Sequence, residues 1–174
     1  MKLIKAIITF IIVFSIDNII GIYMPRTLWG VYVIVPYSLL IAICLYSFYD
    51  EENYLPILAF SFGFILDIYN ANQLGLYACL FPIIVIIIKK YIVGITPLNF
   101  VSIFYISVIT IMTIEIVVFI FISIATSPQV SIFGFIQHRL IITSVFNVML
   151  LTIMYWPLVK LFRPKIKKRK AKLS

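Results

Sequence analysis

Residues 63–78 read GFILDIYNANQLGLYA, a stretch that joins two short apolar segments through a polar turn. The segments cover residues 54–69 and 74–88, and each is somewhat shorter than the roughly 20 residues that a membrane-crossing helix needs. We expect two spans here, and the alternative is a re-entrant hairpin that enters and leaves on one side. In both cases the flanking loops lie on the same side of the membrane.

Four longer apolar segments flank this pair, over residues 3–24, 28–48, 99–125 and 140–162. The first resembles a signal peptide in outline, but its apolar stretch is too long and no small-residue cleavage pattern follows, so we expect a retained span. Pro36 is expected to kink the second, which neighbouring helices tolerate. The sequence therefore predicts an all-α integral membrane protein, a bundle of about six transmembrane helices.

Composition agrees with a lipid environment. Of the 174 residues, 64% are hydrophobic and 11% charged, and mean hydropathy is +1.17. A soluble domain is about half apolar and about a quarter charged, so this chain lacks the polar surface that water requires. We expect one membrane domain over residues 1–162 and a basic cytoplasmic tail over residues 163–174, with no soluble domain.

The basic residues predict the orientation. With the N-terminus inside, twelve Lys and Arg residues fall on the cytoplasmic side, and the outside receives Arg26 and Arg139. This asymmetry places both termini in the cytoplasm. The acidic loop 50–52 then also lies inside, either as a solvated turn or as a contact for a basic partner.

The tail predicts contact with anionic lipid rather than nucleic acid. A basic cluster that directly follows a span gains about 1 kcal/mol per charge at an anionic surface. Basic arms that bind nucleic acid normally extend from a folded basic domain, and we expect neither such a domain nor nucleic-acid binding here. The candidate lipid contacts are Lys165, Lys167, Lys168, Arg169 and Lys170.

Three carboxylates lie inside predicted spans: Asp17, Asp67 and Glu115. Each falls roughly 20 Å from the cytoplasmic start of its helix at 1.5 Å per residue, so all three approach the outer leaflet. Ionisable groups in spans face the bundle interior and pair with one another, which predicts an outer polar cluster of Asp67, Glu115 and Arg139. The alternative is that each carboxylate fixes helix register or sits hydrated at the interface, as Asp17 beside Asn18 suggests.

Small and polar residues recur at helical spacing. Such positions let helix backbones approach in lipid, where apolar burial provides no drive between helices. They are Gly63, Asp67 and Asn70 on one helix, Gly75, Cys79 and Pro82 on the next, and Thr143 and Asn147 on the last. We expect these faces to pack together or against another protein.

Enzyme signatures are missing from the sequence. His138 is the only histidine, and neither HExxH nor GxSxG occurs. Cys44 and Cys79 lack paired spacing and are expected to be packing residues. The sequence also contains no Gly-rich phosphate-binding loop, so the chain cannot energise transport by itself. We expect no catalytic residue, no cofactor and no metal.

The stretch 63–78 also resembles the MreD family of rod-shape-determining proteins, whose members carry Gly then Asp near the end of a short span and Leu-Gly-Leu opening the next. The matching positions are Gly63, Asp67, Leu74, Gly75 and Leu76. Length, span count, an asparagine in the final helix at Asn147 and the basic tail fit the same family.

The resemblance implies a non-enzymatic scaffold of the bacterial elongation machinery in the cytoplasmic membrane. Such proteins are similar in fold to the substrate-binding membrane subunits of vitamin transporters. They bind MreC and help couple MreB filaments to peptidoglycan synthases of the RodA and penicillin-binding type. The candidate structural or partner contacts would then be Gly63, Asp67, Gly75, Glu115, Arg139 and Asn147.

A vitamin-transporter subunit is the alternative function. That class tends to carry a small-residue AxxxA face on its first helix, and here Ala6 is followed four residues on by Phe10. This departure disfavours the alternative.

Overall fold

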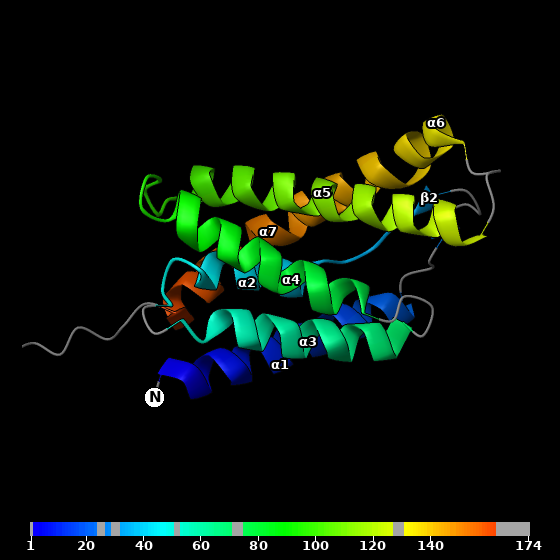
Figure 1. The fold of residues 1–174 in the computed structure, drawn as a ribbon. Coiled ribbons are helices and arrows are strands. Elements are labelled where there is room, and N and C mark those ends of the chain that lie inside the picture. The colour runs from blue at the N-terminus through cyan, green and yellow to red at the C-terminus, as the bar shows by residue number, and fades with distance from the viewer. Residues whose placement is uncertain are drawn as a thin grey trace, which may run out of the picture.

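The computed structural model describes residues 2–23, 27–28, 32–50, 53–70, 75–126 and 131–162, and these fold into six helices along one common axis (Figure 1). The helices are α1 (Lys2–Tyr23), α2 (Ser38–Tyr46), α3 (Leu55–Asn70), α4 (Leu76–Ile87), α5 (Phe100–Thr126) and a last helix made of α6 (Ile132–Phe135) and α7 (Ile141–Phe162). Two π-helical turns, η1 (Ile88–Ile92) and η2 (Ile136–Leu140), extend α4 and connect α6 to α7. Strands β1 (Thr27–Leu28) and β2 (Tyr32–Val33) form a small antiparallel hairpin.

Three of the described helices are long and apolar enough to cross a membrane: Leu3–Tyr23, Phe100–Ile124 and Ile132–Phe162. The predicted spans 54–69 and 74–88 correspond to α3 and to α4 with η1, which are shorter. The all-helical architecture, the six helices and the membrane character are therefore confirmed, and three of the six helices are long apolar candidate spans.

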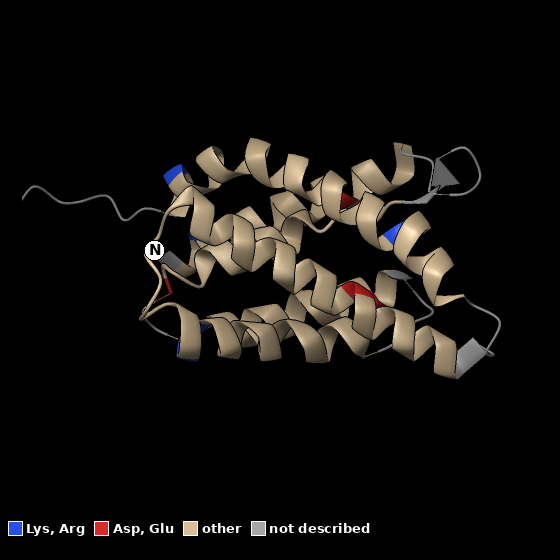
Figure 2. Ribbon diagram, turned by 90° about the horizontal axis from the view of Figure 1, so that it is seen from above, with Lys and Arg blue, Asp and Glu red and all other residues tan. Residues whose placement is uncertain are grey.

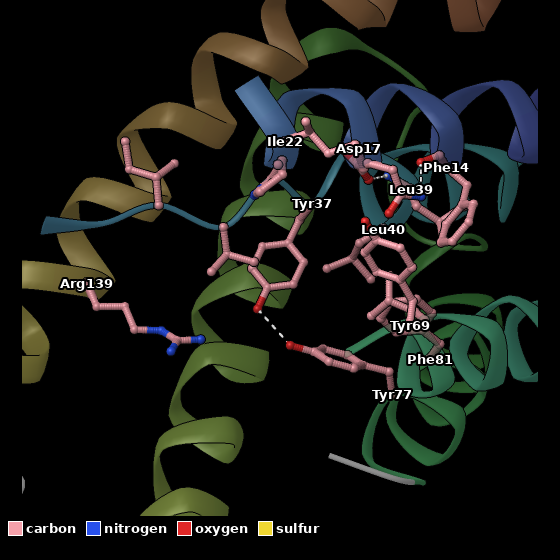
Figure 3. Close-up of a pocket in the computed structure, with 16 residues that line it drawn as sticks. Phe14, Asp17, Ile22, Tyr37, Leu39, Leu40, Tyr69, Tyr77, Phe81 and Arg139 are labelled. Carbon is pink, nitrogen blue, oxygen red and sulfur yellow. Dashed lines mark hydrogen bonds between the residues drawn. The ribbon is translucent and has the colours of Figure 1, made fainter. Parts of the chain in front are cut away.

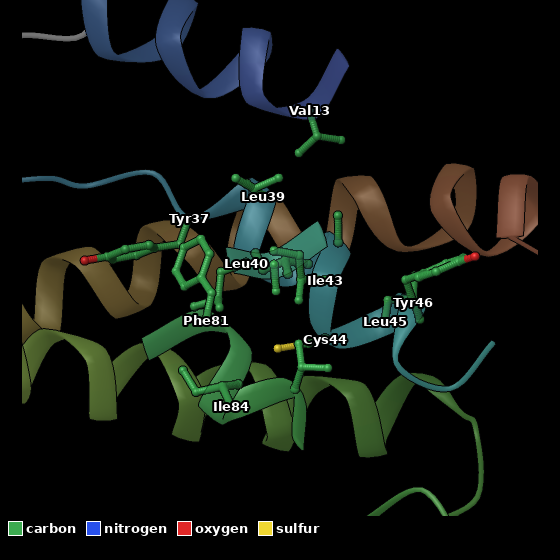
Figure 4. Packing of buried hydrophobic residues seen from close by; sticks show 14 of the residues in the cluster. Val13, Tyr37, Leu39, Leu40, Ile43, Cys44, Leu45, Tyr46, Phe81 and Ile84 are labelled. Atoms are coloured by element: carbon green, nitrogen blue, oxygen red, sulfur yellow. The ribbon is translucent and has the colours of Figure 1, made fainter. Parts of the chain in front are cut away.

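The short helix α2 is the centre of the bundle. All nine of its residues, Ser38–Tyr46, are buried, and it contacts each of the five other helices. Figure 4 shows Leu39, Leu40 and Ile43 packed between side chains of the surrounding helices. A helix that is apolar on every face is stable only when surrounded, so this segment depends on its neighbours.

The predicted span 28–48 is wrong over its first half. Residues 34–37 are not helical and the helix begins at Ser38, so Pro36 precedes the helix instead of kinking it. Proline lacks an N–H and disfavours helical backbone in the residue before it, which explains why the helix cannot extend toward residue 34. The consequence is a helix N-terminus inside the bundle.

The last helix is longer than the predicted 140–162. It starts at Ile132, where the Ser131 hydroxyl accepts a 3.4 Å bond from the Gly134 N–H. The π-helical turn η2 carries Gln137, His138 and Arg139 through the helix without a break. Arg139 thus lies within a helix rather than at its head.

The α3–α4 pair packs closely at Gly63. A Cβ built on Gly63 would stand 2.5 Å from the carbonyl oxygen of Tyr77, so only glycine fits. Sequence spacing placed Cys79 on the packed face of α4, but Cys79 is exposed and the buried positions include Tyr77, Ala78 and Phe81.

The two ends of the bundle differ. At the end where α1 starts and α7 finishes, Phe10 contacts Tyr46, Phe62 and Phe162 edge to face. Basic positions gather at this end (Figure 2), where Lys89 bonds the carboxylate of Asp50. Among the described Lys and Arg residues, Arg139 alone lies in the other half, together with Asp17, Asp67 and Glu115.

We predict that Gly63→Ala destabilises the fold, because the added methyl group must push α4 away from α3. Overpacking of this kind costs about 1–3 kcal/mol. Thermal unfolding in detergent should show a lower Tm. Gly21→Ala is the matched control, since nothing lies within 4 Å of a Cβ there, and its Tm should be unchanged or higher. Equal Tm values for the two variants would refute the close contact.

Candidate functional site

The N-terminus of α2 is capped by a residue from another helix. Asp17 of α1 accepts hydrogen bonds from the Ser38 N–H at 3.1 Å and the Leu39 N–H at 2.9 Å. The first N–H groups of a helix have no partner within it, and in lipid no bulk water replaces one. The carboxylate supplies both acceptors and opposes the positive end of the helix dipole. Asp17 is therefore buried and bonded, not hydrated as its neighbour Asn18 suggested.

Asn147 of α7 completes this cap. Its Oδ1 accepts from the Tyr37 N–H at 2.7 Å, and its Nδ2 donates to the Val35 and Thr143 carbonyls, each at 2.8 Å. The amide thus serves both a donor and an acceptor of the non-helical segment 34–37. One fully buried side chain fixes where this segment meets the last helix.

Asp67 repeats the arrangement at α4. Its two oxygens accept from the Tyr77 N–H at 3.0 Å and the Ala78 N–H at 2.8 Å. The residue before the helix, Gly75, has φ +88°, a left-handed conformation that glycine adopts without steric cost. The fully buried Asp67 thus holds the first turn of α4, directly after Gly75.

A chain of polar groups crosses the bundle between these two caps. Arg139 Nε lies 2.6 Å from Glu115 Oε2, and the Tyr37 hydroxyl donates to Glu115 Oε1 at 2.7 Å. The Tyr77 hydroxyl lies 3.4 Å from that of Tyr37. Because the pair is largely removed from solvent, the loss of one partner would leave a costly buried charge. We call Asp17, Tyr37, Asp67, Tyr77, Glu115, Arg139 and Asn147 the polar network.

The polar network borders a cavity of about 430 Å³. Figure 3 shows Asp17, Tyr37, Tyr77 and Arg139 around it, with Phe14 and Phe81 among its apolar walls. The non-helical segment 34–37 supplies part of the lining, which fits the rule that non-helical backbone at membrane depth lines a cavity or is buried in protein.

The chemistry of the network is that of helix capping and charge pairing. Each carboxylate accepts at least two hydrogen bonds, from backbone N–H groups or from Arg139 and Tyr37. Within the described residues, no group of three or more His, Cys, Asp or Glu side chains could hold a metal ion. The geometry supports positioning of helices, with free space beside it for a ligand.

The structure brings together most positions that the sequence selected. Arg139 pairs with Glu115 as expected, and Asp67 joins them through Tyr77 rather than by a direct ion pair. Gly63, Gly75 and Asn147 each contact or flank the same region. The candidate lipid contacts Lys165, Lys167, Lys168, Arg169 and Lys170 lie outside the described residues.

Sequence reasoning missed the two tyrosines. Tyr37 and Tyr77 are 4% and 3% exposed and connect the caps to the Glu115–Arg139 pair. The only available signal was the position of Tyr37 directly after Pro36 and of Tyr77 directly after the Leu-Gly-Leu motif, since tyrosine is otherwise common at membrane interfaces.

Comparison with known proteins gives one match. Residues 1–165 match the family model described as rod shape-determining protein MreD. No curated protein and no solved structure matches the chain. The match covers every residue of the polar network.

We predict that Asp67→Asn lowers the Tm, because the amide NH2 group that replaces one carboxylate oxygen is a donor and cannot accept from the backbone N–H that this oxygen now serves. An unsatisfied buried donor costs about 1–3 kcal/mol. Ser61→Ala is the matched control on the same helix, since the Ser61 hydroxyl is exposed and bonds the Ile57 carbonyl of its own helix. Unfolding in detergent should separate the two variants, and a wild-type Tm for Asp67→Asn would contradict the capping role.

Charge reversal tests the pair that joins α5 to the last helix. Arg139→Glu should reduce the yield of monodisperse protein severalfold, since breaking a buried pair costs about 3–5 kcal/mol. Combining it with Glu115→Arg should recover part of that yield. Size-exclusion chromatography after matched expression measures both. If the single reversal is harmless, or the double variant is no better than the single one, the pairing does not stabilise the fold.

Proposed function

The chain belongs to the MreD family of rod shape-determining proteins, and from this we propose that it is a non-enzymatic membrane scaffold of the bacterial elongation machinery. Family membership implies a role in rod-shape determination. In the proposal the protein binds MreC and helps couple MreB filaments to peptidoglycan synthases of the RodA and penicillin-binding type. These partners would be organised at the bacterial cytoplasmic membrane.

The observation that carries the proposal is the use of the buried carboxylates. A catalytic pair needs carboxyl groups positioned to exchange protons with a substrate. Here both oxygens of Asp17 and of Asp67 accept bonds from helix N-termini, and Glu115 is paired with Arg139. Such contacts favour a shaped, stable surface over chemistry. Asp67, Glu115 and Asn147 are fully buried, so they would support a partner surface from within, whereas Arg139 and Gly75 are partly accessible.

The proposed orientation has both termini in the cytoplasm. The start of α1 and the end of α7 lie at one end of the bundle (Figure 1), which also carries the described lysines. The positive-inside rule assigns such an end to the cytoplasm. We propose that residues 163–174 continue from it as a basic tail that meets anionic lipid.

The face of α1 weakens the transporter alternative. A docking helix must present small residues outward, yet Ala6 and Phe10 are both fully buried against the core. The corresponding surface is therefore not available to a coupling subunit.

We predict that affinity purification of the tagged chain in mild detergent recovers MreC together with a penicillin-binding protein. Depletion should give rounded cells with normal vitamin uptake. The Gly94→Ala variant should restore rod shape and partner recovery, while Gly63→Ala should restore less of both, because only the second strains the fold. Recovery of an ATPase with a coupling subunit, or of a bound vitamin, would overturn the proposal.

A further inference from the structure

Two residues that line the cavity also lie on the outer surface of the bundle. They are Ile22 and Tyr69, which are 69% and 54% exposed, so the cavity reaches the surface beside them. Both residues lie near the ends of their helices, α1 and α3. Phe14 and Tyr69 meet edge to face with centroids 6.5 Å apart, and both line the space. With the orientation proposed above, on which this step rests, these helix ends lie near the outer headgroup level, and a molecule would enter between them from lipid.

The inner wall of the cavity is polar and charged. Asp17 is 8% exposed and lines the cavity while both its oxygens accept backbone bonds, and a carboxylate oxygen has a second lone pair to offer. Arg139 also lines the cavity, and its pair with Glu115 uses Nε and Nη2 of a group with five N–H donors. An acceptor and a donor thus face the same space.

The charge balance favours a ligand that carries a positive group. Asp17, Asp67, Glu115 and Arg139 all belong to the polar network beside the cavity, and the N-termini of α2 and α4 each add roughly half a positive charge. The balance is roughly one negative charge. Aromatic side chains in the lining, Phe14 and Tyr77 among them, also suit an ammonium group. A purely anionic head would use Arg139 but add to the excess negative charge.

We propose that this cavity binds the headgroup of a zwitterionic phospholipid. The ammonium group would lie near Asp17 and the aromatic walls, and the phosphate near Arg139. The acyl chains would leave between α1 and α3, past Ile22 and Tyr69, into the membrane. The volume of about 430 Å³ falls within the range of small-molecule sites, roughly 300–1,000 Å³.

The test is native mass spectrometry of delipidated protein in detergent with added phosphatidylethanolamine or phosphatidylglycerol. We expect one phosphatidylethanolamine per chain, bound at least about tenfold more tightly than phosphatidylglycerol, which lacks the ammonium group. Soluble glycerophosphoethanolamine is the third arm and should bind far more weakly. Equal binding of the two lipids, or soluble-head binding as tight as that of the lipid, would overturn the proposal.

Gly21→Phe locates the bound lipid. Gly21 lines the cavity and nothing lies within 4 Å of a Cβ there, so the ring can occupy the mouth without disturbing the polar network. Gly94→Phe adds the same ring at an equally open position outside the cavity lining. At a Tm close to that of the wild type, Gly21→Phe should lose at least about tenfold in phosphatidylethanolamine binding, and Gly94→Phe should lose none. Undiminished binding by Gly21→Phe would place the lipid elsewhere and refute the site.

Discussion

A helix that begins inside a membrane protein must find acceptors for its first N–H groups, and this fold is arranged around that need. Pro36 prevents the second apolar segment from continuing as one helix, which leaves the start of α2 among its neighbours. Asp17 and Asn147, from the first and last helices, meet the requirement. The break therefore links the first helix to the last. The positions of α1 and α7 along the bundle axis are fixed relative to each other, because a side chain from each must reach the N-terminus of α2. In lipid, apolar packing alone fixes the position of a helix along the membrane normal poorly, because helices are not driven together there by the hydrophobic effect as they are in water.

The same device occurs at α4, and the two caps explain the arrangement of charge. Burying a carboxylate in hydrocarbon costs free energy unless the carboxylate is paired with a cation or hydrogen-bonded. A helix N-terminus can take the place of the cation, because it carries partial positive charge and free N–H donors. Two of the three buried carboxylates need no Arg or Lys for this reason, so Glu115 can hold Arg139. Tyr37 belongs to both arrangements, since its N–H bonds Asn147 and its hydroxyl bonds Glu115. The caps and the ion pair are therefore parts of one continuous structure.

The sequence was sufficient for the membrane class, the family and the Glu115–Arg139 pair, because hydropathy and buried charge leave few alternatives. It was insufficient for α2. Residues 28–48 are as apolar as a true span, and their hydropathy does not tell a helix in lipid from a non-helical segment bonded inside protein. Asp17 was misjudged for the same reason: its partners are backbone N–H groups, which every residue except proline carries and no motif identifies. Tyr37 and Tyr77 were missed because they are distant in sequence and only the folded structure brings their hydroxyl groups together.

The two halves of the bundle differ in how they can change. One end is closed by interlocking aromatic side chains around Phe10, which resist rearrangement, and the Lys89–Asp50 pair lies at the same end. The other end holds the polar network, a left-handed glycine at Gly75 and a cavity. Asp17 lines that cavity and also caps α2, the helix that contacts all five others. A change at Asp17 would thus reach the whole bundle through a single cap, whereas a change in one ring around Phe10 would meet close-packed neighbours.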